Sequence, residues 1–258
     1  MDSTYIHYRK DEQQFAREVA KIADICRQRG IVKVTDFLDP YRQTIVMNIC
    51  NQSNDLQYCF YGAFPEAERK RAMIMPADWE CDWDEFRVAT LAIHVQGVQK
   101  PLRHGDYLGA LLGQGIKREK LGDVVIVNDI CYVALDAAIA EYTGIHLHQV
   151  SRYTANVEFV TEDQLPQMEQ QFSFVENTVS SLRLDSIVKL AYNLSRGKAA
   201  EYIKKGLVKH NWGVCENIDQ SVRMGDVISM KGATRIKILA VTAPNKKGRI
   251  PVKIGKYL

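Results

Sequence analysis

The sequence predicts an α+β protein built from three successive parts, and three observations lead to that prediction. Apolar residues recur at helical spacing near the N-terminus. Segments of strand and helix character then follow in the order β-α-β-β-α-β over 88–160. Positive charge is concentrated from Leu182 onward, where the pattern changes again. The predicted parts are residues 1–80, 81–160 and 182–258, with a linker over 161–181.

The N-terminal part is predicted to be an α/β subdomain. Four apolar residues share one face of a helix over 11–29: Phe15, Val19, Ile22 and Cys26. Gly30 ends this helix, and a second helix follows the segment FLDP. Strands are expected over 56–64 and 71–76. The acidic segment PADWECDWDE (76–85) is expected to be an exposed connector.

The second part has the element order of a ferredoxin-like domain. Its expected strands and helices are, in order, 88–95, helix 104–115, 123–128, 130–135, helix 137–149 and 155–160. Asn128 and Asp129 suit a tight hairpin turn, and Asp136 can cap the helix that follows. RNA-recognition motifs (RRMs) share this topology but stack bases on aromatic side chains of two central strands. Because those strands offer little beyond Tyr132 here, the part is RRM-like in order without that chemistry.

Charge divides the chain more sharply than its overall net value of +3 indicates. From Leu182 to the C-terminus there are 16 Lys and Arg residues against 5 Asp and Glu, a formal net charge of +11. The preceding 181 residues hold 18 basic and 26 acidic side chains, a net charge of −8. Such asymmetry indicates a polyanion-binding module joined to parts with another role. A basic surface that only aids solubility is the alternative.

The sequence contains no apolar run near the roughly 20 residues that span a bilayer. Its polar N-terminus lacks the apolar region of a signal peptide, so we expect a cytoplasmic protein with no membrane insertion. The six cysteines are scattered without a CxxC pair, which favours reduced structural thiols over a metal site. His146 and His148 would point in different directions on a helix. We therefore predict no metal and no cofactor.

The third part opens with two predicted helices. The apolar stripe of the first helix comprises Leu184, Ile187, Val188, Ala191 and Leu194. Ser195 is expected to cap the second helix, whose first turn holds Arg196 and Lys198. The helix dipole disfavours cations at that end, so their removal is expected to stabilise the free protein slightly. A phosphate placed between these cations and the free amide groups would turn this unfavourable interaction into a favourable one. Such cations are also tolerated in first turns without any ligand.

Strands are expected next in LVKHN, GDVISMKG and RIKILAV, with a turn at NWG. The basic tail over 245–258 contains no acidic residue. It either adds phosphate contacts or remains flexible.

RLDSIVKLAYNLSRGKAAEYIKKGLVKHN, followed by VRMGDVISMKG, resembles the S4 RNA-binding domain, an αL-type fold, over about 182–240. The resemblance implies RNA contacts from eight residues: Arg183, Ser195, Arg196, Lys198, Lys204, Lys205, Lys209 and Asn211. Many members have an Arg-Gly-x-Gly-Arg turn where this chain has Lys231-Gly232-Ala233-Thr234-Arg235. Lys231 and Arg235 keep a cation at each end of that turn and remain candidates. Trp212 replaces the small hairpin residue of the common pattern, and either stacks on a base or covers the core.

Further segments resemble the YlmH proteins of Gram-positive bacteria and their cyanobacterial relatives, the photosystem II S4-domain proteins. These segments are HYRKDEQQF, TDFLDP, AERKRA and RHGDYLGALLGQGIKREKLGD. Membership implies a three-part protein that binds rRNA and tRNA on the large ribosomal subunit. It also implies a role in ribosome-associated quality control, the rescue of stalled peptidyl-tRNA complexes. We expect a monomer.

A second RNA contact is considered at the loop that follows the GALLGQG segment. The candidate residues are Lys117, Arg118 and Lys120. A solvated turn without any RNA contact is the alternative.

Two other function classes are weighed against a non-enzymatic RNA-binding factor. S4 domains also accompany RNA-modification enzymes such as pseudouridine synthases. The sequence shows no synthase-type catalytic Asp, no HIGH or KMSKS signature and no glycine-rich cofactor loop, so we predict no enzyme. A scaffold for cell division or the photosystem would instead use the acidic first two parts. Deletion of 182–258 would then leave its function intact.

Overall fold

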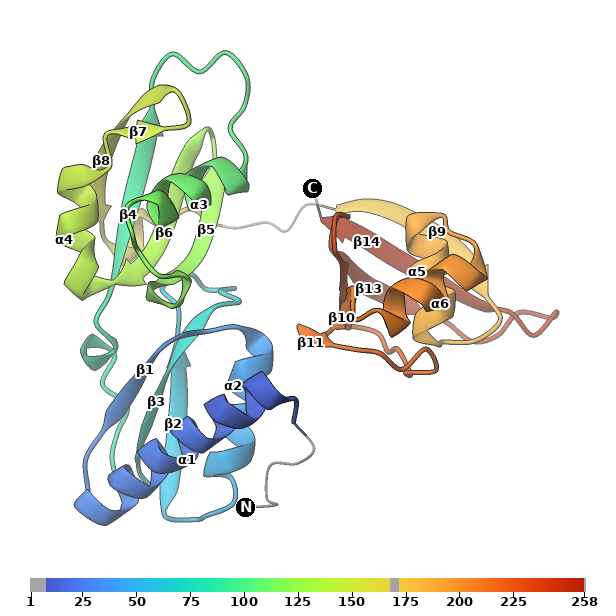
Figure 1. The fold of residues 1–258 in the computed structure, drawn as a ribbon, viewed down its shortest axis with the longest axis horizontal. Helices are drawn as coiled ribbons and strands as arrows, with labels where there is room; N and C mark the ends of the chain where they lie inside the picture. The colour runs from blue at the N-terminus through green and yellow to red at the C-terminus, as the bar shows by residue number, and fades with distance from the viewer. Residues whose placement is uncertain (1–7, 168–171, 258) are drawn as a thin grey trace. The chain divides into compact units, whose positions relative to one another are not determined.

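A computed structural model describes residues 8–167 and 172–257 of the chain (Figure 1). The chain divides into two compact units, Met1–Met168 and Glu169–Leu258. Helices and antiparallel sheets occur in both units, which confirms the predicted α+β class. Within the described ranges, no helix is both long enough and apolar enough to cross a membrane.

The first unit begins with two helices packed on one face of a small sheet (Figure 1). Its first elements are α1 (Lys10–Arg29), β1 (Lys33–Leu38), α2 (Pro40–Cys50), β2 (Leu56–Tyr61) and β3 (Lys70–Pro76). The strands pair antiparallel in the order β1-β3-β2. Val19 of α1 and Ile45 of α2 are buried against Ile74 of β3. Asp39 caps α2 by accepting a hydrogen bond from the Arg42 N–H at 2.8 Å.

The expectation that all cysteines are reduced is wrong for two of them. Cys59 of β2 and Cys81 form a disulfide, with their Cα atoms 6.8 Å apart. The two residues are separated by 22 positions and meet because the chain returns past β2 after the antiparallel β2–β3 pair. Cys81 lies in the connector over 76–85. Trp79 and Trp83 of this connector are 44% and 56% exposed, as expected for an exposed segment.

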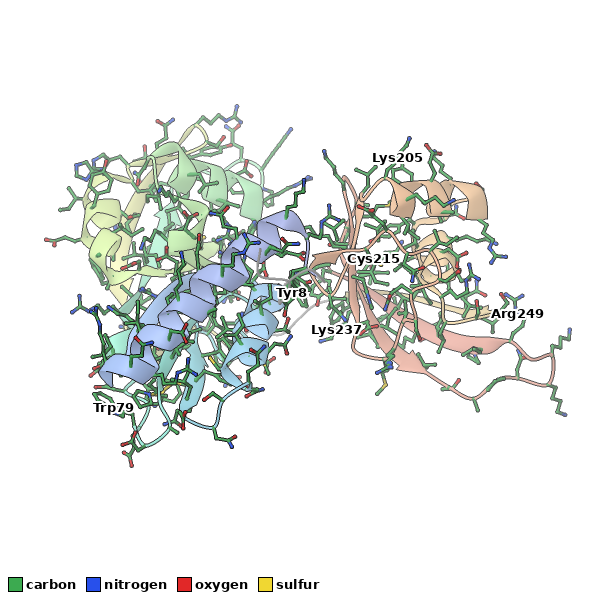
Figure 2. All side chains as sticks on the ribbon, turned by 60° about the horizontal axis from the view of Figure 1, so that its bottom comes forward. Tyr8, Trp79, Lys205, Cys215, Lys237 and Arg249 are labelled. Atoms are coloured by element: carbon green, nitrogen blue, oxygen red, sulfur yellow. A yellow bond between two sulfur atoms is a disulfide. The ribbon has the colours of Figure 1, made fainter. Side chains whose placement is uncertain are left out.

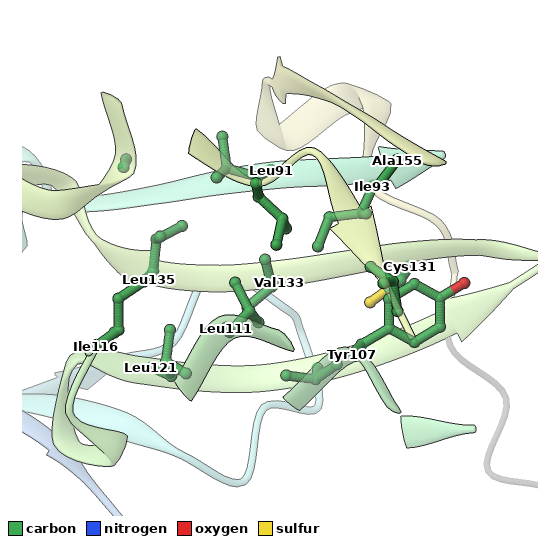
Figure 3. Close-up of a cluster of buried hydrophobic side chains, with 14 residues drawn as sticks. Leu91, Ile93, Tyr107, Leu111, Ile116, Leu121, Cys131, Val133, Leu135 and Ala155 are labelled. Carbon is green, nitrogen blue, oxygen red and sulfur yellow. The ribbon is translucent and has the colours of Figure 1, made fainter. Parts of the chain in front are cut away.

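The second part of this unit has the predicted β-α-β-β-α-β order with one short strand added. Its elements are η2 (Asp84–Phe86), β4 (Val88–Val95), α3 (His104–Gly113), η3 (Arg118–Lys120), β5 (Leu121–Val127), β6 (Ile130–Asp136), α4 (Ala137–His146), β7 (Gln149–Val150), β8 (Tyr153–Val160) and η4 (Glu162–Gln164). The sheet order is β5-β6-β4-β8-β7. Asn128 and Asp129 turn the β5–β6 hairpin at φ values of 50° and 62°. Figure 3 shows the core between this sheet and its helices, with Tyr107 of α3 near Cys131 of β6.

The other face of this sheet packs against the N-terminal elements. Phe37 of β1 and Phe64 are buried against Ala134 of β6, with Tyr132 at the edge of the same cluster. A Cβ at Gly122 would lie 2.8 Å from the Phe37 ring, so glycine permits this close approach. The face on which RRMs stack bases therefore joins two parts of one unit here.

The second unit consists of a six-stranded antiparallel sheet and two helices (Figure 1). Its elements are β9 (Phe172–Val179), α5 (Leu184–Tyr192), α6 (Arg196–Lys204), β10 (Val208–His210), β11 (Gly213–Val214), β12 (Val227–Met230), β13 (Ile236–Val241) and β14 (Ile250–Tyr257). The strand order is β11-β10-β12-β13-β14-β9. Ile187 of α5 and Ile203 of α6 are fully buried in one core with Ile254 of β14.

Strands occur in two segments for which the sequence analysis predicted none. The expected linker over 161–181 includes β9, and the tail over 245–258 includes β14. These strands pair along eight residues, from Phe172 opposite Tyr257 to Val179 opposite Ile250. Alternate residues such as Val175 and Val252 face the core, whereas the polar residues between them obscure the strand pattern. The linker prediction is thus wrong for β9, and the flexible alternative is wrong for β14.

Candidate nucleic-acid interface

The second helix of the C-terminal unit begins as predicted. The Ser195 hydroxyl accepts a hydrogen bond from the Lys198 N–H at 3.2 Å, which satisfies one of the free amides at the start of α6. Gly206 follows the helix in the left-handed conformation, at φ +66°. Both first-turn cations are exposed, and the Arg196 side chain keeps 62% of its surface in solvent.

A buried carboxylate lies beside the start of this helix. Asp185 is 1% exposed and accepts a 3.1 Å hydrogen bond from Arg196 Nε. Arg183 donates from Nε and Nη2 to the two oxygens of the same carboxylate, each at 3.1 Å. Burial opposes ionisation of Asp185, but the bonds from Arg183 and Arg196 outweigh it and hold the pKa below its usual value.

This contact corrects the electrostatic argument made from the sequence. Arg196 was expected to conflict with the helix dipole, whereas the negative charge of Asp185 offsets it. Removal of Arg196 would take a hydrogen bond from a buried carboxylate, so we no longer expect it to stabilise the free protein. The expectation of slight stabilisation now applies to Lys198 alone.

The other predicted lysines of this region are exposed. They are Lys198, Lys204 and Lys205 on and after α6, Lys209 on β10 and Lys231 after β12. Lys205 pairs with Glu201 at 2.6 Å, one helical turn earlier. An exposed pair of this kind contributes little, so a phosphate can readily replace it.

Asn211 and Trp212 form the turn between β10 and β11, both at positive φ. The Asn211 amide donates to Asp226 at 2.9 Å, and its oxygen accepts the Val227 N–H at 2.8 Å. His210 lies 2.7 Å from the same Asp226 carboxylate. The Asn211 side chain therefore fixes the turn to the start of β12, and its contact with RNA stays a prediction.

Trp212 is half-buried beside Arg235. The Arg235 guanidinium lies 5.9 Å from the Trp212 ring centroid and 4.2 Å from that of Tyr257. Both distances are in the range of cation–π contact. Of the two cations at the ends of the 231–235 turn, Lys231 is exposed and Arg235 contacts the Trp212 and Tyr257 rings. Whether Trp212 stacks on a base or covers the core stays open.

The loop considered as a second RNA contact forms η3, and two of its cations are engaged within the first unit. Arg118 donates to the Leu121 carbonyl at 2.7 Å, and burial lowers its pKa to about 10. Lys120 Nζ donates to Asp36 at 2.6 Å and to Asp136 at 3.0 Å, and these bonds raise its pKa. Lys117 is exposed. Whether this loop contacts RNA or is a solvated turn stays open, and Lys117 is its exposed cation.

Two anchoring carboxylates, Asp185 and Asp226, were not singled out by sequence reasoning. Burial opposes ionisation of Asp226, but hydrogen bonds from Asn211, Arg223 and His210 hold its pKa below the usual value. The two residues stand in the RLD and GD segments of the S4-like pattern. That pattern is the sequence signal that could have identified these two carboxylates, although it does not show which side chains they bind. In the parts of the chain that the structure describes, no cluster of His, Cys, Asp or Glu could hold a metal ion.

Three family models match successive segments of the chain. They are described as "YlmH, N-terminal" at residues 11–79, "Putative RNA-binding domain in YlmH" at 82–164 and "S4 domain" at 182–228. The chain is also 31% identical over 249 residues to the Ribosome-associated protein quality control protein P2 of Bacillus subtilis (strain 168). That alignment covers 96% of each protein. The chain belongs to the YlmH family.

The fold agrees with that membership. The Cell division protein ylmH from Streptococcus pneumoniae is similar to 61% of this YlmH-family chain and to 96% of its own, with a TM-score of 0.55. At 14% identity this likeness concerns the fold alone. The S4 match includes α5, α6 and β10, whereas β9, β13 and β14 lie outside it.

Proposed function

We propose that this YlmH-family chain is a non-enzymatic, monomeric RNA-binding protein that acts on the large ribosomal subunit in the cytoplasm. Its partners would be large-subunit rRNA and tRNA, and its role the quality control of stalled peptidyl-tRNA complexes. The exposed cations on and around α6, within the S4 match, carry the RNA-binding part of the proposal. The end-to-end similarity to a ribosome-associated quality control protein supports the ribosomal part.

The proposed binding mode is electrostatic. Lysines that neutralise phosphates release condensed counterions, so the affinity for RNA falls steeply as salt rises. Lys198 and Lys204 are exposed on α6, and Asp185 holds the Arg196 side chain in one orientation. An RNA backbone along α6 would therefore meet a guanidinium paired with Asp185 and exposed ammonium groups that gain counter-charges on binding.

Crosslinking of the full-length protein to RNA in cell lysate, followed by sequencing of the attached fragments, tests this proposal. We expect large-subunit rRNA together with tRNA. A double Lys198→Ala, Lys204→Ala variant should recover several-fold less RNA than the matched Lys21→Ala, Lys100→Ala control, which removes two exposed lysines of the first unit.

Recovery of free tRNA or mRNA alone would contradict the ribosomal part. Incubation of the protein with uridine-containing tRNA tests the non-enzymatic part separately. Modified nucleosides in that tRNA would show instead an RNA-modification enzyme.

A further inference from the structure

The second unit contains a pocket of about 290 Å³ beside the start of α6. It lies between α5, α6 and the β9–β14 strand pair, which is an extension beyond the S4 match. Four elements or their connections supply its lining: Asn177, Thr178, Val179, Ser180, Ser186, Lys189, Leu190, Arg196 and Arg249.

The charges of this lining all have one sign. Lys189 comes from α5, Arg196 from the first position of α6, and Arg249 from the residue before β14. None of the described residues that line the pocket is acidic. Asp185 offsets part of the charge of Arg196, and an anion in the pocket would relieve the repulsion that remains among the three cations. The charge pattern therefore matches an anionic ligand.

Two of the three cations are held in place by hydrogen bonds, Arg196 from outside the pocket and Arg249 by a residue of its lining. Asp185, which is not part of the lining, binds Arg196 Nε at 3.1 Å. Arg249 donates from Nη2 to the Thr178 carbonyl at 2.7 Å and from Nε to the Thr178 hydroxyl at 2.8 Å. Figure 2 labels Arg249 on this unit. Both guanidinium groups are thus oriented before any ligand arrives, which lowers the entropy lost on binding.

The uncharged lining suits an oxyanion. The side chains of Ser180 and Asn177 can each donate a hydrogen bond, whereas the Ser186 hydroxyl donates to Asp185 at 3.3 Å. Arg guanidinium and Lys ammonium groups are the usual partners of phosphate, the former in a forked geometry. The positive end of the α6 dipole adds to the same field because Arg196 is its first residue.

We propose that this pocket binds a backbone phosphate of RNA, with Lys189 and Arg249 as contacts outside the residues that the S4 pattern implies. The proposal rests on the proposed RNA-binding function and extends it onto the β9–β14 pair. The RNA would pass from the exposed lysines of α6, across Arg196, to Arg249. A free phosphate or nucleotide has the same chemistry, and the experiment separates the two sources.

The test measures the affinity of the full-length protein for total ribosomal RNA across a salt series. Lys189→Ala and Arg249→Ala should each reduce the log–log slope by roughly 0.7 to 0.9, the value for one lost phosphate contact. Lys247→Ala is the matched control, because Lys247 is exposed two residues from Arg249 and does not line the pocket. Arg249→Lys keeps the charge and should restore most of the slope. If Arg249→Ala lowers the midpoint temperature of unfolding, the salt slopes of Lys189→Ala and Arg249→Lys still test the proposal.

Titration with inorganic phosphate, followed by amide NMR at constant ionic strength, separates the source of the anion. We expect shifts at Ser180, Ser186 and Lys189 that disappear in Arg249→Ala. Phosphate binding with unchanged RNA slopes in both alanine variants would overturn the proposal in favour of a free anion. Unchanged slopes without phosphate binding would overturn it entirely. In either case a reduced slope in Lys198→Ala, Lys204→Ala would leave the proposed function standing.

Discussion

Short runs of cations occur in both units, and the two runs have different surroundings in the folded chain. In the first unit, Arg118 and Lys120 of η3 point to main-chain carbonyls and carboxylates of neighbouring strands. In the second unit, Lys198 and Lys204 of α6 are exposed. The comparison indicates that the contacts made in the folded chain, rather than local cation density, decide whether a basic segment is exposed.

The inward cations of the first unit connect its two sheets. Arg69 of the loop before β3 donates to the Phe37 carbonyl of β1 at 3.0 Å and to the Leu121 carbonyl of β5 at 2.9 Å. Arg71 of β3 donates to the Thr35 carbonyl at 2.7 Å and lies 3.5 Å from Asp136. Burial lowers the pKa of both guanidinium groups. These contacts join the two sheets, so Arg69 and Arg71 have a structural role.

The largest expected effect comes from breaking this inner network. Arg71 is 8% exposed. Arg71→Met would remove a hydrogen bond from the Thr35 carbonyl and an ion pair from Asp136. We expect a loss of about 3 to 5 kcal/mol in the free energy of unfolding, as for other broken buried pairs. Urea denaturation followed by tryptophan fluorescence measures it, since Trp79 and Trp83 lie in the same unit.

RNA affinity under native conditions should change less than about twofold in Arg71→Met, because its effect is on folding. Lys117→Met is the control, an exposed cation of the same unit. Wild-type stability of Arg71→Met would show that the network does not hold the sheets together, and the contrast between the units would fail.

Elements with a one-sided apolar pattern were the ones that the sequence predicted well. The helices α1, α5 and α6 bury residues at helical spacing, which periodicity detects, whereas β4 and β6 are short apolar runs with consecutive buried residues. β1 was not predicted, because Lys33 and Asp36 interrupt a strand of six residues. β9 and β14 were missed because half of each strand faces away from the core and is polar or aromatic.

The site was predicted less completely than the fold. The cap by Ser195 and the exposure of the lysines on α6 follow from local pattern. The pairing of Arg196 with Asp185, eleven residues earlier, and the disulfide between Cys59 and Cys81 depend on tertiary contacts. No local rule encodes such contacts, so the sequence showed the cations but not their counter-charges.

A smaller loss in the free energy of unfolding is expected on replacement of Asp185, the carboxylate that binds Arg196. This loss should depend on pH. Because the folded-state pKa of Asp185 is lowered, its contribution is fully present above the unfolded-state value of about 3.9. It is lost as pH falls through that value toward the folded-state pKa. Asp185→Asn should therefore be less stable at pH 7 by about 1 to 3 kcal/mol, the scale of hydrogen bonds to charged groups.

Urea denaturation at several pH values between 7 and 3 measures the difference between the wild type and Asp185→Asn. This difference should shrink below about pH 4, while other carboxyl groups titrate in both proteins and cancel. Asp219→Asn provides the control, since Asp219 also pairs with Arg183 but is exposed. A difference that stays constant down to pH 3 would show that Arg183 and Arg196 do not lower the pKa of Asp185.

The smallest expected effect bears most directly on the contrast between the units. Lys117 and Lys198 are both exposed lysines, one beside η3 and one in the first turn of α6. In a salt series with total ribosomal RNA, Lys198→Ala should reduce the log–log slope by roughly 0.7 to 0.9, and Lys117→Ala should leave it unchanged.

An equal reduction in Lys117→Ala would mean that RNA reaches the first unit as well. The inward contacts of Arg118 and Lys120 would then position the loop for RNA instead of withdrawing it from RNA. Both lysines are exposed, so a difference between the two variants would point to their surroundings. Lys198 lies at the positive end of a helix beside Arg196, where a phosphate relieves repulsion. Lys117 instead adjoins η3, in which Arg118 is bound to a main-chain carbonyl and Lys120 to two carboxylates.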